Sequence, residues 1–136
     1  MPNSDQPTAL PSDAQWEVMN VVWDQGEVTV AEVWRVLSAR RAVARNTVLT
    51  LMARLEEKGW LCRQKESTVL RYSATIPRQK ALRRIARRLV DTAFRGSAEG
   101  LVMALLDDGE LSEGESQRIR AMLAKARREK KGRNKS

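Results

Sequence analysis

The chain has no histidine and a single cysteine, Cys62, among its 136 residues. One cysteine cannot form a disulfide within the chain, and carboxylates with one thiolate are a poor ligand set for zinc or copper. The lack of histidine also removes the commonest general base of enzymes. We therefore expect no metal centre, no cofactor, no small-molecule substrate and no enzymatic activity. We expect Cys62 to be a small apolar residue of the fold and not a redox switch.

Long hydrophobic runs are also missing. No segment reaches the roughly 20 apolar residues that a membrane-spanning helix requires, and the N-terminal residues lack the apolar core of a signal peptide. These absences predict a cytoplasmic protein. Aromatic residues make up only 4% of the chain, and all four tryptophans fall within the first 60 residues. Their spacing follows the apolar faces of helices, so we interpret them as packing residues and not as a platform on which bases stack.

Acidic residues are absent between Val33 and Leu55, although the chain contains 17 of them. The same segment holds five arginines: Arg35, Arg40, Arg41, Arg45 and Arg54. An ordinary solvated surface would mix both signs, so a segment of one sign indicates contact with phosphate groups. The overall charge of +8 is not the evidence for this site, because residues 1–70 hold 8 basic and 9 acidic groups, whereas residues 71–136 hold 17 and 8.

The stretch from Arg45 to Gly59, RNTVLTLMARLEEKG, predicts a helix that reads DNA. Four apolar residues recur at helical spacing and should bury one side: Val48, Leu51, Met52 and Leu55. The opposite side carries short polar or basic residues, which suit a major groove: Asn46, Thr47, Thr50 and Arg54. Asn or Thr near the start can cap the first turn, and Gly59 predicts the end of the helix. A helix with a merely solvated outer face would show the same pattern, but the arginine-rich context favours DNA binding.

A β-hairpin is predicted directly after this helix, with strands at residues 60–65 and 69–74 joined by residues 66–68. Lys65 and Arg71 lie near its tip. Basic residues there can protect an exposed strand edge, but beside a reading helix we favour contact with backbone phosphates.

Two shorter helices are expected before the reading helix. Ser12 and Gln15 predict a capping box that opens a first helix ending near Asp24. Residues 28–30 can add a short strand to the hairpin, and residues 31–39 predict a second helix.

Three further helices are predicted after the hairpin, from Pro77 to Gly96, from Ala98 to Leu106 and from Ser112 onward. Their apolar stripes are narrow and cover no sheet, so one copy cannot bury them well, whereas two copies can by mutual packing. We therefore expect a homodimer, with these interface residues: Leu89, Phe94, Leu101, Val102, Leu105, Leu106, Ile119, Met122 and Leu123. The basic helix from Lys80 to Arg95 has an alternative interpretation as a surface for anionic lipid or RNA.

Several of these motifs together resemble one family. The segment from Leu10 to Trp34 reads LPSDAQWEVMNVVWDQGEVTVAEVW, and NTVLTLMARLEEKGWL and RYSA follow it in order. Over roughly residues 10–128 the chain resembles the winged-helix repressors of the penicillinase and methicillin-resistance type, the BlaI/MecI family. The resemblance implies a mainly α fold with a small β-wing. The expected organisation is a disordered N-terminus at 1–11, a winged helix-turn-helix DNA-binding domain at 12–75, a helical dimerisation region at 76–128 and a basic disordered tail at 129–136.

The motifs and the resemblance predict a homodimeric transcriptional repressor that binds an inverted-repeat operator. Three residues at the start of the reading helix are expected to contact base edges or nearby phosphates: Asn46, Thr47 and Thr50. Six basic residues are expected to contact phosphates: Arg40, Arg41, Arg45, Arg54, Lys65 and Arg71. Arg45 stands at the helix start, where it can also reach a guanine. Two alternatives stay open: a winged-helix interaction module that does not read DNA, and a membrane- or RNA-binding protein that uses its basic helix.

Three departures from the family pattern bear on function. Leu49 stands where members commonly carry an aromatic or basic residue, which leaves that contact and the operator open. Lactam-responsive members are inactivated by cleavage of an Asn-Phe bond, whereas residues 101–106 here read LVMALL, and Ala104–Leu105 lies nearest to that bond. Relief of repression through a membrane metalloprotease sensor is therefore left open. The cysteine-rich tail of the copper-responsive relatives is absent, so copper sensing is not expected.

Overall fold

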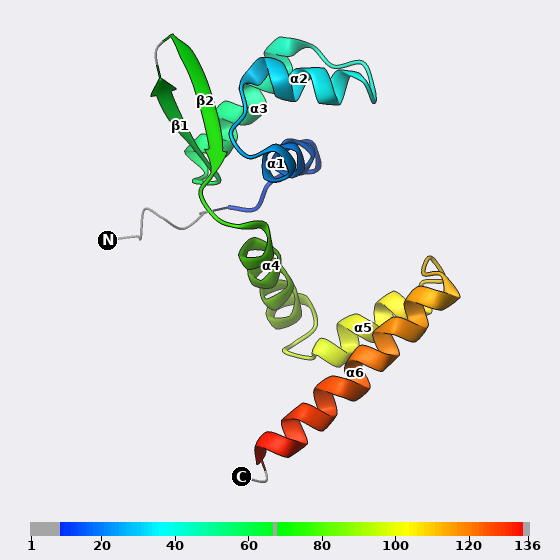
Figure 1. Ribbon diagram of the computed structural model, residues 1–136. Coiled ribbons are helices and arrows are strands. Elements are labelled where there is room, and N and C mark those ends of the chain that lie inside the picture. Colours follow the sequence, from blue (N-terminus) through cyan, green and yellow to red (C-terminus); the bar gives the residue numbers. More distant parts are fainter. Residues whose placement is uncertain (1–8, 67, 135–136) are drawn as a thin grey trace. The chain divides into compact units, whose positions relative to one another are not determined.

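The computed structural model describes residues 9–66 and 68–134, without the side chains of residues 65, 66 and 134. In this part of the chain the elements follow in the order α1, α2, α3, β1, β2, α4, α5, α6 (Figure 1), which confirms the predicted mainly α fold with a small β-wing. They form two compact units, one up to Arg83 and one from Arg84 onward. None of the described helices has the length and apolar character needed to cross a membrane.

Helix α1 (Asp13–Gln25) begins and ends as its sequence predicts. The Gln15 backbone N–H donates to Ser12 Oγ at 3.3 Å, and the Ser12 N–H donates to Gln15 Oε1 at 2.9 Å. This capping box satisfies two N–H groups that a helix start would otherwise leave unpaired, and its prediction is confirmed. Gly26 ends the helix with a φ of 88°, a conformation that glycine adopts without steric cost.

The core of the first unit lies where α1, α2 (Val30–Ser38) and α3 (Arg45–Glu57) contact one another. Its fully buried side chains come from all three helices: Val18, Met19, Val22, Val33, Leu37, Val48, Met52 and Leu55. Burial of one such side chain stabilises a fold by about 1.5–3 kcal/mol. Trp16, Trp23 and Trp60 pack against one another with ring centroids 5.6–6.4 Å apart, which confirms that these three are packing residues.

The end of α3 turns the chain into the wing. Gly59 has a φ of 88°, its N–H donates to the Glu56 carbonyl at 3.0 Å, and the Trp60 N–H donates to the Leu55 carbonyl at 2.9 Å. These two bonds form a Schellman motif, which confirms the predicted glycine stop. Strand β1 (Leu61–Glu66) then pairs antiparallel with β2 (Val69–Ala74). The first strand therefore lies one residue later than predicted.

The expected strand at residues 28–30 is reduced to a single β-bridge, so that prediction is wrong in extent. Val28 and Tyr72 exchange backbone hydrogen bonds of 2.9 and 2.7 Å. The next residue, Thr29, caps α2 instead, because its Oγ1 accepts from the Glu32 N–H at 3.2 Å. The side-chain cap starts a helix at Val30, where the strand would have continued.

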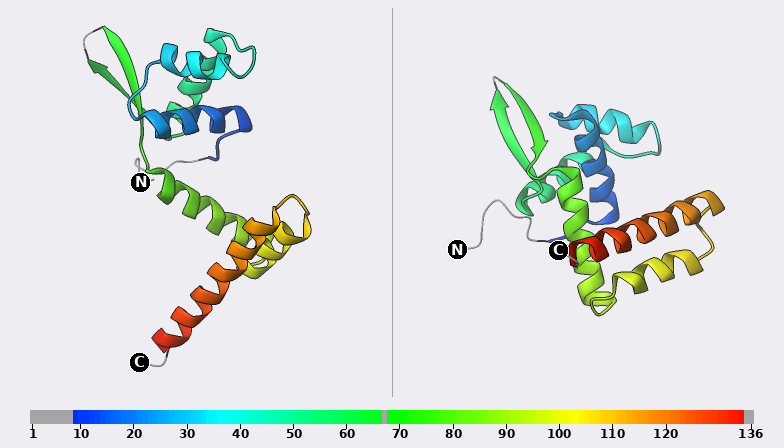
Figure 2. Two further views of the ribbon diagram at one scale, coloured as in Figure 1. Left: turned by 45° about the vertical axis from the view of Figure 1, so that its right-hand side comes forward. Right: turned by 60° about the horizontal axis from the view of Figure 1, so that its bottom comes forward.

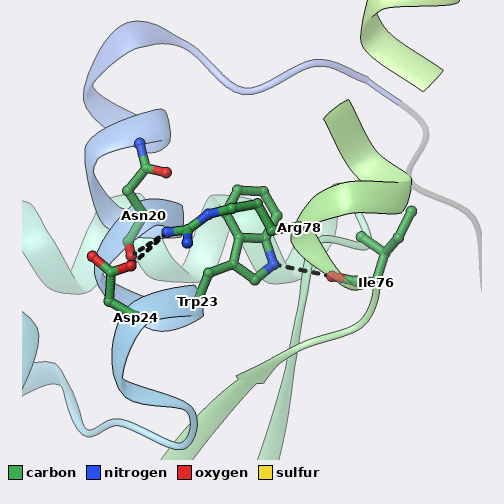
Figure 3. A network of polar contacts seen from close by, with 5 residues as sticks. All are labelled: Asn20, Trp23, Asp24, Ile76 and Arg78. Carbon is green, nitrogen blue, oxygen red and sulfur yellow. Dashed lines mark hydrogen bonds and ion pairs between the residues drawn. The ribbon is translucent and has the colours of Figure 1, made fainter. Parts of the chain in front are cut away.

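The start of α4 (Arg78–Ala93) is bound to α1 through a network of polar contacts (Figure 3). Trp23 Nε1 donates to the Ile76 carbonyl at 3.0 Å. The Arg78 guanidinium lies over the Trp23 ring, 5.5 Å from its centroid, and donates to the Asn20 carbonyl at 3.2 Å and to Asp24 Oδ1 at 2.7 Å. A cation at this end of α1 complements the negative end of the helix dipole, and α1 has no basic residue of its own in its last turn.

The second unit contains the rest of α4 with α5 (Ala98–Asp107) and α6 (Glu113–Asn134). Helices α5 and α6 lie side by side and run in opposite directions (Figures 1 and 2). Ser112 caps α6 as predicted, since its Oγ accepts from the Glu115 N–H at 3.1 Å. The basic tail differs from its prediction of disorder, because α6 continues to Asn134. The residues of α6 are mostly Ala, Arg, Lys and Glu, which have high helix propensity. Residues 135–136 lie outside the described part.

The residues before α1 also differ from the expected disordered segment at 1–11, as far as they are described. Trp60 Nε1 donates to the Ala9 carbonyl at 2.7 Å, and Lys58 Nζ donates to the Leu10 carbonyl at 3.1 Å. Pro11 is buried. These contacts join residues 9–11 to the end of α3, a partner that lies about fifty residues away in sequence. Residues 1–8 lie outside the described part.

Candidate nucleic-acid interface

The turn between α2 and α3 has a backbone held at both ends. The Leu37 carbonyl accepts hydrogen bonds from the N–H groups of Arg40 and Arg41, at 3.0 and 3.2 Å. Trp34 Nε1 donates to the Val43 carbonyl at 2.8 Å across the turn. The half-buried fourth tryptophan therefore orders the segment that carries two of the predicted phosphate contacts, a role that sequence analysis missed. The sequence feature that could have indicated this role is a tryptophan close to a basic turn.

Helix α3 separates its two sides as predicted. Val48, Met52 and Leu55 are fully buried, whereas Leu51, predicted on the same side, is only half-buried. The predicted DNA contacts of the opposite side are all exposed: Asn46, Thr47, Thr50 and Arg54. Among these, Thr50 Oγ1 donates to the Asn46 carbonyl at 3.1 Å, which leaves its lone pairs as the free hydrogen-bonding sites. The exposed side therefore offers a mixture of donors and acceptors in its first two turns.

The start of α3 differs from its prediction in one respect. The N-cap residue is Ala44, and no side chain caps the first turn. Asn46 and Thr47 already lie inside the helix, beyond the position from which a side chain can cap it. The first turn also contains no acidic residue. The first turn of α3 thus supplies no carboxylate of its own to the positive end of the helix dipole, which favours an incoming phosphate there.

Two of the predicted phosphate contacts are paired with carboxylates. Arg41 Nη2 lies 2.9 Å from Glu17 Oε1, and Arg71 Nη1 lies 3.8 Å from Glu32 Oε1. The four side chains are 36–47% exposed. Ion pairs at this exposure contribute only about 0–1 kcal/mol, so they do not prevent either arginine from binding phosphate.

The other basic residues of the predicted site are less constrained. Arg40, Arg45 and Arg54 are exposed and form no ion pair with any described residue. Lys65 belongs to β1, but its side chain lies outside the described part, as does all of residue 67 at the turn of the wing. The contribution of the wing tip to DNA binding thus stays a prediction.

Three exposed apolar side chains accompany this surface. Leu49 on α3 is 43% exposed, and Val69 and Leu70 on the wing are 45% and 38% exposed. The sequence distinguishes Leu49 only as a departure from the family pattern. The exposure of both Val69 and Leu70 was not predicted, because strand alternation predicts that one of two neighbouring residues is buried.

The predicted dimerisation residues lie on α4, α5 and α6 and are not buried within one copy. Leu89, Leu105 and Met122 are 42%, 47% and 65% exposed. The remaining members are half-buried: Phe94, Leu101, Val102, Leu106, Ile119 and Leu123. Ala104, beside the predicted cleavage position, is exposed in α5.

Comparison with known proteins gives one consistent result. The family model of the penicillinase repressor matches residues 11–125. The methicillin resistance regulatory protein MecI of Mammaliicoccus sciuri is 25% identical over 121 residues, which cover 89% of this chain and 98% of MecI. The penicillinase repressor of Bacillus licheniformis is 28% identical over 120 residues, covering 88% of this chain and 94% of the relative.

Two solved structures of BlaI are also similar. The solution structure of the DNA-binding domain of the repressor BlaI is 33% identical, with a TM-score of 0.48, and the match covers 54% of this chain and 88% of that one. Bacillus licheniformis BlaI in complex with the blaP half-operator is 33% identical, with a TM-score of 0.47 and coverage of 53% and 88%. Because the family model spans most of its length, this chain belongs to the penicillinase repressor family of transcriptional repressors.

Proposed function

We propose that this DNA-binding transcriptional repressor acts as a homodimer on an inverted-repeat operator, with α3 of each copy in a major groove. The observation that carries the proposal is the exposed surface formed by α3 and the turn before it. This surface carries Arg40, Arg41, Arg45 and Arg54, and the segment between Val33 and Leu55 has no acidic residue. Trp34 and Leu37 hold its backbone in place. A rigid, basic, polar surface on a helix is suited to a groove lined by phosphates.

Reading and positioning are assigned to different residues. Asn46, Thr47 and Thr50 would contact base edges, because groove-entering helices make their base contacts near their N-termini. Arginines of the turn, of α3 and of the wing would contact phosphates and set the register. The proposed location is the cytoplasm, where a repressor meets its operator.

The homodimer is supported by the apolar surface of the second unit. Among the described residues from Arg84 onward, only Val90 is buried, and α5 has no buried residue at all. Exposed Leu89, Met103 and Leu105 would be covered by the same helices of a second copy. Two-fold symmetry of the protein then requires two-fold symmetry of the operator.

The proposal is tested by selecting bound duplexes from a random-sequence library with the full chain. We expect enrichment of an inverted repeat whose half-sites are separated by a whole number of helical turns. Affinity for the selected duplex should fall steeply with salt, because phosphate contacts release counterions. Enrichment of no sequence, with weak binding that salt does not affect, would support the interaction-module alternative instead.

Regulation by a membrane metalloprotease sensor is a separate hypothesis that comes from the family resemblance. The bond between Ala104 and Leu105 lies inside α5, where both residues are exposed. A helical segment must unfold locally before a protease can bind it in an extended form, so cleavage here would require opening of α5. Incubation of the full chain with such a protease, followed by mass determination of the fragments, would identify the bond.

A further inference from the structure

We propose that Glu17 is a positioning residue for DNA binding: from α1 it holds the guanidinium of Arg41 in the orientation that contacts a backbone phosphate. The inference rests on the proposed function, in which Arg41 is a phosphate contact. It adds a residue from outside the basic segment, with a charge opposite to the one that DNA attracts. The sequence separation of 24 residues explains why no local pattern points to it.

The backbone that carries Arg41 is already ordered before DNA arrives. Its N–H donates to the Leu37 carbonyl at 3.2 Å, and Trp34 holds the far side of the turn through the Val43 carbonyl at 2.8 Å. The conformational freedom that remains is in the long side chain of Arg41. Immobilising such a side chain has an entropic cost, which a contact made in the free protein removes from the binding step.

Glu17 makes that contact through one hydrogen bond. Arg41 Nη2 donates to Glu17 Oε1 at 2.9 Å, with the two side chains 47% and 36% exposed. A guanidinium has five N–H donors in a planar fork, so this bond leaves donors free for a phosphate. The phosphate can therefore bind without displacing the carboxylate, and Glu17 supports the arginine without competing for it.

The second carboxylate–arginine pair of this surface has a different geometry. Arg71 Nη1 lies 3.8 Å from Glu32 Oε1, too far for a hydrogen bond, and the same Glu32 oxygen accepts from Thr29 Oγ1 at 3.3 Å. Glu32 is thus engaged in the start of α2. Of the two predicted phosphate contacts that face a carboxylate, only Arg41 has a short directional hydrogen bond to it, so the positioning role is assigned to Glu17 alone.

The test measures binding of the full chain to a scrambled-sequence DNA duplex over a range of salt concentrations. A scrambled duplex suffices, because a phosphate contact carries no sequence information. Glu17→Ala should weaken binding by about twofold to fivefold, which is the most that an ion pair of this exposure can contribute to ordering the Arg41 side chain. Glu17→Gln keeps an oxygen that accepts from Arg41 and should bind like the unmodified chain, after correction for the lost negative charge. Thermal unfolding monitored by tryptophan fluorescence checks that each variant is folded.

Glu27 supplies the matched charge control. It is exposed, has no ion pair with a described residue and lies in the same unit. Glu17→Ala is therefore compared with Glu27→Ala, and Glu17→Gln with Glu27→Gln. In an Arg41→Ala background, Glu17→Ala should have no effect beyond that of Glu27→Ala, because Glu17 acts only through Arg41.

The outcomes separate this inference from the proposed function. If Arg41→Ala changes neither affinity nor the salt slope, Arg41 is not a phosphate contact, and that part of the proposed function fails together with the inference. If Arg41→Ala weakens binding but Glu17→Ala matches or exceeds the affinity of its control, the positioning role alone is overturned. Equal weakening by Glu17→Ala and Glu17→Gln would also overturn it, since the hydrogen bond would then be irrelevant.

Discussion

At the scale of single residues, the threonines of α3 show how local bonding limits what a side chain can read. The Thr50 hydroxyl donates its hydrogen to the Asn46 carbonyl at 3.1 Å. A base donor such as the amino group of adenine or cytosine is then its natural partner, because the lone pairs remain available. Thr47 is exposed one turn earlier on the same side of the helix. We infer that both contribute to base discrimination.

Replacing Thr47 and Thr50 together by Ala should remove most of the discrimination between operator and scrambled duplex. Each good base contact contributes about 1–3 kcal/mol of discrimination, and the double substitution removes both threonine hydroxyl groups. The measurement is a pair of binding titrations at one salt concentration. Thr92→Ala is the matched control, because Thr92 makes the same bond to the carbonyl four residues before it, at 2.7 Å. A double variant that discriminates like the unmodified chain would place base reading elsewhere.

Arginines that only position the protein should behave differently from arginines that read bases. Substitution of Arg54 or Arg71 by Ala should weaken binding to operator and scrambled duplex alike, and should lower the slope of log K against log salt by roughly one unit. Arg118→Ala in α6 controls for the change in net charge. Arg45 is the decisive case, since it begins α3. Loss of operator affinity alone, at an unchanged slope, would assign Arg45 to base reading.

At the scale of elements, the junction between α3 and the wing depends on one residue. Gly59 has a φ of 88° and completes the two hydrogen bonds that end α3. The following residue, Trp60, is buried at 3% exposure and packs in the tryptophan cluster. A change at Gly59 would therefore disturb both the end of the reading helix and the first strand of the wing.

Gly59→Ala should lower the free energy of unfolding of the first unit by about 1–2 kcal/mol, because a β-carbon is strained at positive φ. Gly59→Asn should lower it by less, since asparagine tolerates this conformation better. Denaturant titration followed by tryptophan fluorescence reports on this unit, where all four tryptophans lie. Equal stability of the alanine variant and the unmodified chain would show that the glycine conformation is not required.

At the scale of the whole molecule, the two units differ in how well one copy buries its apolar residues. The first has a core to which all three of its N-terminal helices contribute. In the second, exposed Met103, Leu105 and Met122 lie on α5 and α6, and Val90 is the one buried residue among those described. A surface of this kind is expected to associate, and the sequence spacing of its apolar residues already predicted it.

Leu105→Asp should convert the proposed dimer into a monomer at micromolar concentration, because an unpaired charge would be buried among apolar side chains. Sedimentation of the full chain and of the variant measures this change. Leu10→Asp is a matched control, since Leu10 and Leu105 are both 47% exposed and Leu10 lies in the first unit. A monomeric unmodified chain would contradict the homodimer itself.

The sequence by itself determined those features that depend on residues within one turn of each other. The capping box of Ser12 and Gln15 and the division of α3 into a buried and an exposed side follow from spacings of three or four residues, and the end of α3 follows from a single glycine, Gly59. The DNA-binding role also followed from sequence, because the local absence of acidic residues is visible without a fold.

Only the tertiary structure decided which groups from distant segments meet. Helix packing brings Glu17 to Arg41, Trp23 to Ile76 and Trp60 to Ala9, and no pattern in the sequence links these pairs. It also decided that residue 29 caps a helix and does not extend a strand, since both outcomes suit a threonine locally. The physical reason is the same in each case: capping and periodicity act over a few residues, whereas ion pairs and packing depend on where the backbone brings whole helices together.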